Sequence, residues 1–256
     1  MNKELIKEGK FSYIETSPGK PILLLLHGLF GSLSNFQYII KDFGDDYNVV
    51  LPMIPIFEMP LKEVSVRNYA LFIQEFVEFK EYESFHVLGN SLGGHIAQLV
   101  TVLMPEKVNA MILTGSSGLY EKAFGSGFVK RNNYDYIKTK AETTFYDPAL
   151  ADKEMVDEIF ETVNDRKKAL SILYTAKSAI RENLSEELKT IKNNSLLIWG
   201  NQDIITPPFV GEKFHELLEN SELHFLDKCG HAPMMELPEQ FNAILKDYLS
   251  RIDKQN

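Results

Sequence analysis

Short apolar runs alternate with amphipathic stretches along most of the chain. Ile22–His27 contains five consecutive aliphatic residues and predicts a strand buried on both faces. Further strands are expected at Tyr47–Pro52, Ser84–Gly89, Val108–Thr114, Asn194–Gly200 and Glu222–Asp227. Apolar residues at helical spacing predict helices at Val66–Lys80, Ser91–Met104, Pro208–Glu219 and Pro238–Ile252. This alternation predicts an α/β fold, a mostly parallel sheet flanked by helices.

The alternation is interrupted between about residues 119 and 188, where we expect no buried strand. Within this stretch, Glu154–Leu173 has apolar residues on one helical face. The opposite face carries acidic residues that we interpret as a solvated surface: Glu154, Asp157, Glu158, Glu161 and Asp165. The simplest domain organisation is a core of residues 1–118 and 189–256, with residues 119–188 inserted as a helical cap.

A serine lies at the junction of a predicted strand and a predicted helix, in Gly89-Asn90-Ser91-Leu92-Gly93. This segment fits the pattern G-x-S-x-G, which needs a strand before it and a helix after it. Glycines two positions before and after the serine permit a tight turn that lifts the hydroxyl above the carboxyl end of the sheet. The N-terminus of the helix favours negative charge at the same place. Ser91 is therefore the candidate nucleophile of a hydrolase.

A serine nucleophile needs a base, and that base needs an acid to orient it. Asp203 and His231 lie just past two later predicted strands, in the order Ser…Asp…His that accompanies such a turn. Because the carboxyl ends of parallel strands meet at one edge of a sheet, we expect both side chains beside Ser91.

Acyl transfer also needs donors for the developing oxyanion. The backbone N–H of Leu92, directly after the nucleophile, is one candidate. The second candidate is the N–H of Leu29 in the loop after the first buried strand. Gly28 and Gly31 allow this loop to turn tightly toward a substrate.

The charge balance and the cysteine content exclude several classes of partner. The chain has 27 basic and 36 acidic residues, a net charge of −9, so we expect no nucleic-acid binding. The single cysteine, Cys229, cannot form an internal disulfide or a thiolate zinc cluster. The histidines lack H-x-x-x-H spacing and there is no phosphate-binding loop, so we expect neither a metal nor a cofactor.

No segment has the character of a membrane anchor or an export signal. The longest apolar runs fall far short of the roughly 20 residues that a membrane helix needs. Met1–Glu8 lacks the apolar region of a secretory signal. We therefore expect a cytoplasmic protein.

With these motifs, the chain resembles the α/β-hydrolase superfamily over nearly its full length. The resemblance rests on the His27-Gly28 loop, the Gly89–Gly94 turn, the acid loop Gly200–Pro207, and Gly230-His231-Ala232-Pro233 followed by Glu236 and Pro238. It implies that residues 119–188 form a helical cap over the active site. The ordered Ser91, Asp203 and His231 together with the two oxyanion elements give the leading hypothesis, a small-molecule substrate that is a small or medium carboxylic ester or thioester cleaved through an acyl-enzyme on Ser91. The acyl chain, the leaving group and the oligomeric state stay open.

Two other hypotheses are kept. The segment Gly89–Gly94 is similar to the nucleophile turn of meta-cleavage-product hydrolases, which cut carbon–carbon bonds in dienol diketo-acids and carry a cap arginine for the substrate carboxylate. Arg166 is in a suitable place, although an ordinary solvated arginine is the favoured interpretation. Phe30 and Asn90 are further candidate substrate contacts. Ala232 departs from that group, which usually has tryptophan there. The third hypothesis is a ligand-binding protein of this fold with little turnover.

Overall fold

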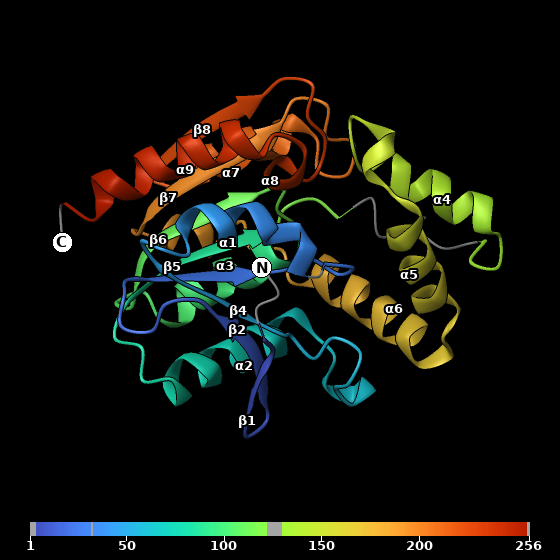
Figure 1. The fold of residues 1–256 in the computed structure, drawn as a ribbon, viewed down its shortest axis with the longest axis horizontal. Helices are drawn as coiled ribbons and strands as arrows, with labels where there is room; N and C mark the ends of the chain where they lie inside the picture. The colour runs from blue at the N-terminus through green and yellow to red at the C-terminus, as the bar shows by residue number, and fades with distance from the viewer. Residues whose placement is uncertain (1–3, 32, 122–129, 255–256) are drawn as a thin grey trace.

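The computed structural model describes residues 4–31, 33–121 and 130–254 of the 256-residue chain. These residues form an eight-stranded sheet with the strand order β1-β2-β4-β3-β5-β6-β7-β8 (Figure 1). The strands are β1 Ile6–Glu8, β2 Phe11–Glu15, β3 Ile22–Leu26, β4 Asn48–Pro52, β5 Phe85–Asn90, β6 Val108–Thr114, β7 Asn194–Gly200 and β8 Ser221–Leu226. Neighbours from β4 to β8 are parallel, whereas β1 with β2 and β2 with β4 are antiparallel. The predicted α/β fold is confirmed.

Side chains of the central strands alternate between two apolar layers, because successive residues of a strand point to opposite faces. On one face, Leu24 and Leu26 belong to a cluster with α2, α3 and α7. On the other face, Leu23 and Leu25 belong to a cluster with α1, α8 and α9. These helices are α1 Gln37–Phe43, α2 Val66–Phe79, α3 Leu92–Leu103, α7 Pro208–Leu217, α8 Pro233–Glu236 and α9 Pro238–Ile252. The central strands are thus buried on both sides, as their apolar runs predict.

The N-terminal hairpin of β1 and β2 was not predicted from the sequence. β1 has only three residues and is mostly accessible to solvent, so it carries little apolar signal. β2 offered a usable signal, because Phe11 and Tyr13 alternate with polar Ser12 and both bury their rings against Phe76 of α2. Gly9, with φ of 58°, lies in the turn between the two strands.

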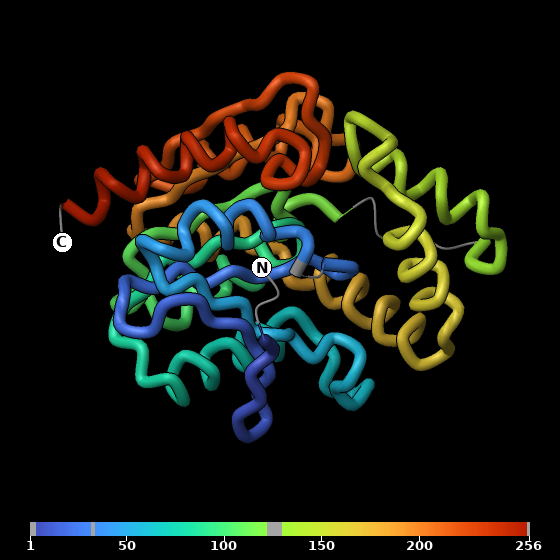
Figure 2. Tube along the Cα trace, in the orientation of Figure 1, coloured from blue at the N-terminus to red at the C-terminus, as the bar shows by residue number. Residues whose placement is uncertain are grey.

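Three α-helices lie between β6 and β7 in the part of the chain that the structure describes. They are α4 Tyr134–Glu142, α5 Lys153–Asn164 and α6 Arg166–Arg181. Figures 1 and 2 show them, coloured yellow-green to gold, as one group at the edge of the core. We call residues 119–121 and 130–188 the helical insertion. None of the helices in the described ranges has the length and apolar character needed to cross a membrane.

The helical pattern over Glu154–Leu173 is divided between α5 and α6, a break that the pattern of apolar residues did not indicate. Asp165 ends α5 and begins α6, and its carboxylate accepts a hydrogen bond of 2.8 Å from the Lys168 N–H. Aspartate is among the preferred residues at a helix N-cap, so Asn164-Asp165 was a signal for this break.

Candidate active site

Ser91 lies between the last residue of β5 and the first residue of α3. Its backbone has φ of 55° and ψ of −121°, a conformation that side chains rarely adopt and that costs about 1–3 kcal/mol. The turn closes at two glycines. A Cβ on Gly89 would lie 2.2 Å from the Gly93 carbonyl oxygen, and one on Gly93 would lie 2.0 Å from that of Leu26. The turn leaves Ser91 partly exposed, whereas the neighbouring residues are buried.

The Asp203 and His231 side chains meet in a buried pair after β7 and β8. Asp203 Oδ2 lies 2.9 Å from His231 Nδ1 and accepts a bond of 2.8 Å from the Thr206 hydroxyl. Asp203 Oδ1 accepts from the N–H groups of Ile205 and Thr206 at 2.8 and 2.9 Å. The Trp199 indole donates to the Thr206 carbonyl and steadies the loop. A carboxylate held in this way keeps the proton of the imidazole on Nδ1 and presents Nε2 as the basic nitrogen.

The turn that bears Ser91 is tied to the loop that bears His231. The side-chain amide of Asn90 donates to the carbonyl oxygens of Thr114 and His231 at 2.9 and 3.1 Å. A Cβ on Gly115 would lie 2.6 Å from the His231 carbonyl oxygen, so the end of β6 lies directly against the histidine. The structure therefore brings the turn of Ser91 and the side chains of Asp203 and His231, the candidate nucleophile, acid and base, to one edge of the sheet.

The expected substrate contact of Asn90 needs correction. Its side chain is buried and its amide group donates to two backbone carbonyls of neighbouring loops. An amide used in this way joins parts of the protein instead of facing a ligand.

Two backbone segments converge on Ser91 at the positions expected for oxyanion donors. Leu92 is the first residue of α3, where helix geometry supplies no acceptor for the N–H group. Gly28 faces the nucleophile, because a Cβ there would lie 3.3 Å from Ser91 Cβ. The Gly31 N–H donates to the Gly28 carbonyl at 3.0 Å and closes the loop around Leu29. The N–H groups of Leu29 and Leu92 stay the candidate donors.

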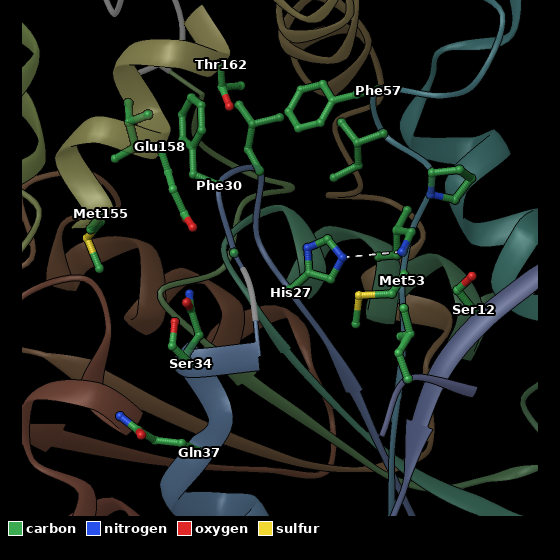
Figure 3. Close-up of a pocket in the computed structure, with 18 of the residues that line it drawn as sticks. Ser12, His27, Phe30, Ser34, Gln37, Met53, Phe57, Met155, Glu158 and Thr162 are labelled. Atoms are coloured by element: carbon green, nitrogen blue, oxygen red, sulfur yellow. Dashed lines mark hydrogen bonds between the residues drawn. The ribbon is translucent and has the colours of Figure 1, made fainter. Parts of the chain in front are cut away.

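His27 braces this loop. Its Nδ1 lies 2.8 Å from the Gly28 carbonyl oxygen, and its Nε2 accepts from the Ile54 N–H at 3.3 Å (Figure 3). Burial lowers the pKa of His27, so the imidazole is neutral at pH 7 and joins the Gly28 loop to the segment after β4.

A cleft of about 1080 Å³ lies beside Leu29 and Phe30, between the segment after β4 and helix α5. Figure 3 shows Phe30 near Glu158 and Thr162 of α5, with Phe57 on the adjoining wall. Other apolar side chains of its wall include Ile54, Phe72, Leu150, Met155 and Ile159. Phe30 thus lines this cleft, whereas Ser91 and His231 do not belong to its lining, and a substrate contact of Phe30 stays a prediction.

Ionisable side chains also line this cleft. Two are basic, Lys7 and Lys10, and four are acidic, Glu58, Asp152, Glu154 and Glu158. The sequence predicted that the acidic face of Glu154–Leu173 is a solvated surface. Two of its residues, Glu154 and Glu158, also line the cleft.

Arg166 lies away from the cleft. It is the first residue of α6, is exposed, and does not belong to the lining of the cleft. This placement agrees with an ordinary solvated arginine and gives no support to a carboxylate clamp.

Two residues that hold Asp203 and the His231 loop in place received no role from the sequence. Thr206 donates to Asp203, and its position three residues after an aspartate is a usable turn signal. Glu236 accepts hydrogen bonds from Gly230 and Ala232, on both sides of His231. Glu236 belongs to the segment on which the resemblance rests, and its partners Gly230 and Ala232 are only six and four residues away, so the sequence did offer a signal for this contact.

Cys229 is fully buried beside the His231 loop. Burial raises the pKa of its thiol, and the nearby carboxylates of Glu236 and Asp203 raise it further. The thiol therefore stays protonated and packs as a small apolar residue. Within the described ranges, no group of three or more His, Cys, Asp or Glu side chains could hold a metal ion.

Comparison with known proteins points to one family. Residues 21–238 match the family model described as the alpha/beta hydrolase fold. The crystal structure of MGS-MChE2, an alpha/beta hydrolase enzyme from the metagenome of Mar Chica lagoon sediments, is 42% identical with a TM-score of 0.82, covering 98% of this chain and 99% of that one. The uncharacterized hydrolase YugF of Bacillus subtilis (strain 168) is 26% identical over 251 residues, 91% of each chain. The 2-hydroxy-6-oxononadienedioate/2-hydroxy-6-oxononatrienedioate hydrolase of Paraburkholderia phymatum is 26% identical over 265 residues, 95% of this chain and 92% of that protein.

Proposed function

The chain belongs to the α/β-hydrolase family, and on that premise we propose that it is a serine hydrolase of small or medium carboxylic esters or thioesters. One observation carries the proposal: the Asp203–His231 pair at 2.9 Å, tied through Asn90 to the strained turn that bears Ser91. A buried carboxylate that orients an imidazole beside an accessible serine is the arrangement that activates serine for acyl transfer.

In the proposed reaction, Ser91 Oγ attacks the substrate carbonyl carbon while His231 Nε2 takes the hydroxyl proton. The N–H groups of Leu29 and Leu92 stabilise the resulting oxyanion. His231 then gives its proton to the leaving alcohol or thiol, and the acyl group stays on Ser91. His231 takes a proton from a water molecule that attacks the acyl carbon; the bond to Ser91 Oγ then breaks, His231 returns the proton to Oγ, and the acid leaves. Asp203 stabilises the imidazolium in both halves of the reaction without taking its proton.

The lining of the cleft supports an uncharged substrate. Its acidic residues outnumber its lysines four to two, and Lys10 forms an ion pair with Glu75. A substrate with a second carboxylate would meet a negative potential there. Phe30 and Phe57 offer apolar area for an uncharged acyl or alcohol group.

The test compares wild-type enzyme with Ser91→Ala on p-nitrophenyl esters whose acyl chains have about two to eight carbons, lengths that a mostly apolar cleft of this kind can enclose. We expect turnover and labelling by a fluorophosphonate probe to be lost in Ser91→Ala, with unchanged circular dichroism. The exposed Ser250→Ala is the matched control and should keep both. Turnover retained by Ser91→Ala would remove the nucleophile assignment. A wild-type Ser91 that the probe does not label would favour the ligand-binding hypothesis.

Cleavage of carbon–carbon bonds in a dienol diketo-acid is the second candidate, because a similar protein is named as a hydrolase of 2-hydroxy-6-oxononadienedioate. It would use the same Ser91, Asp203 and His231. It also needs a cation for the substrate carboxylate, and Arg166 lies outside the cleft. Faster turnover of such a diketo-acid than of every ester in the panel would select this candidate.

A further inference from the structure

The loop that carries His231 is held by one carboxylate and by the helical insertion. The Gly230 N–H donates to both carboxylate oxygens of Glu236, at 2.9 and 3.0 Å, and the Ala232 N–H donates to Glu236 Oε1 at 3.1 Å. The N–H between them, that of His231, donates to the Thr144 carbonyl at 2.9 Å. Three consecutive N–H groups around the base therefore have acceptors, and one acceptor comes from a distant part of the chain.

Glu236 also reaches the helical insertion. The Tyr146 N–H donates to Glu236 Oε2 at 2.8 Å. A Cβ on Gly230 would lie 2.7 Å from the Thr144 carbonyl oxygen and 2.9 Å from the Tyr146 nitrogen, so the two backbones are in direct contact. Phe145, between these residues, is buried in the same apolar cluster as Ala232. Residues 144–146 and the His231 loop thus form one packed unit.

We propose that Glu236 is a positioning residue that locks His231 to the helical insertion, so that the base is placed for reaction only while residues 144–146 are seated against its loop. The inference rests on the proposed serine mechanism, in which His231 must lie within hydrogen-bond reach of Ser91. A displacement of about 1 Å in such a group can cost about 100-fold in rate.

This arrangement links binding to reaction. Residues 144–146 lie between α4 and α5, and α5 forms one wall of the cleft. A substrate that binds in the cleft and holds α5 in place therefore also holds residues 144–146 against the His231 loop.

The experiment measures kcat per folded molecule, KM, and the rate of Ser91 phosphonylation by a fluorophosphonate in Glu236→Gln. Glutamine keeps one acceptor oxygen but places an N–H₂ group against the backbone donors. We expect kcat and the phosphonylation rate to fall together by about 10- to 100-fold, with KM changed less than about 3-fold. The exposed Glu239→Gln, one turn away in α9, is the matched control and should resemble wild type.

Gly230→Ala tests the same contact from the other side, because its Cβ would push residues 144–146 away while leaving the carboxylate intact. We expect a similar fall in kcat, and a double variant that loses less than the product of the two single effects. Unchanged kcat per folded molecule in either single variant, with only a lower unfolding midpoint, would overturn the proposal. If wild type hydrolyses no ester, the proposed function fails, but the phosphonylation rates still decide whether Glu236 positions the base.

Discussion

Ser91 has a backbone conformation that lowers the stability of the folded protein and leaves the residue partly exposed. Its φ of 55° lies in the region that favours glycine, yet serine is present. The surrounding contacts enforce this conformation: the Ser91 N–H donates to the Thr114 carbonyl, and the Ser91 carbonyl accepts from Gly94 and Ser117. Strain that the packing maintains in this way is typical of reactive residues.

This strain predicts that Ser91→Gly is more stable than Ser91→Ala by about 1 kcal/mol, because glycine adopts a positive φ without a Cβ clash. Urea unfolding of both variants measures the difference. The same pair of substitutions at Ser250, inside helix α9, is the control, where glycine should be less stable than alanine by about 1 kcal/mol. A Ser91→Gly protein that unfolds at lower urea than Ser91→Ala would show that the turn is not strained.

At the scale of elements, helix α5 has a double role that its sequence does not show. Val156 and Val163 fix it to apolar clusters, while Glu154 and Glu158 line the cleft. Whether an acidic face meets solvent or a cleft depends on what the fold places opposite it, and here that is the segment after β4 and Phe30.

Glu158→Lys should therefore change the preference between charged and neutral substrates. We expect the ratio of kcat/KM for an anionic ester, such as a monoester of succinate, to that for a neutral ester of equal length to rise about 5-fold, which is about 1 kcal/mol. The matched control is Glu161→Lys, on the same helix but outside the cleft. An equal effect of both substitutions, or a Glu158 effect that is seen only at low salt and disappears at high salt, would contradict a local role of the cleft charge.

For the whole molecule, Glu121 makes stability depend on pH. Burial raises the pKa of its carboxyl to about 7, although a hydrogen bond from the Gly118 N–H opposes the shift. Between its ordinary pKa near 4.5 and pH 7, the folded state binds more protons than the unfolded state. The contribution of Glu121 to the free energy of unfolding is therefore complete below pH 4.5 and is lost as the pH rises through 7.

Glu121→Gln keeps an acceptor for the Gly118 N–H without the charge. At pH 8 the urea concentration at its unfolding midpoint should be higher than that of wild type, and at pH 4.5 the two midpoints should be nearly equal. The difference between variant and wild type isolates this group, because His95, whose pKa burial lowers to about 4, titrates alike in both proteins. The exposed Glu106→Gln should show no such pH-dependent difference. A difference that grows toward low pH instead would contradict a raised pKa at Glu121.

The sequence by itself determined the central strands, the helices that follow them and the glycine-flanked serine turn, because these depend on local properties. Five consecutive aliphatics form a buried strand in any suitable sheet, and a positive φ at Ser91 needs small residues at fixed neighbouring positions. The order Ser…Asp…His also predicted that Asp203 and His231 meet, since parallel strands end at one edge. The short exposed β1 and the helix break at Asp165 carried weaker local signals and were missed.

Only the tertiary structure decided which way side chains point and what they meet across the chain. It turned Asn90 toward two backbone carbonyls, placed Arg166 outside the cleft, and brought Glu236 between the His231 loop and Tyr146. Asn90 and His231 are 141 residues apart in the sequence, and Tyr146 and Glu236 are 90 residues apart. Contacts of this kind arise from the packing of whole elements, and hydrogen bonds in a buried site go to whichever group that packing brings within reach.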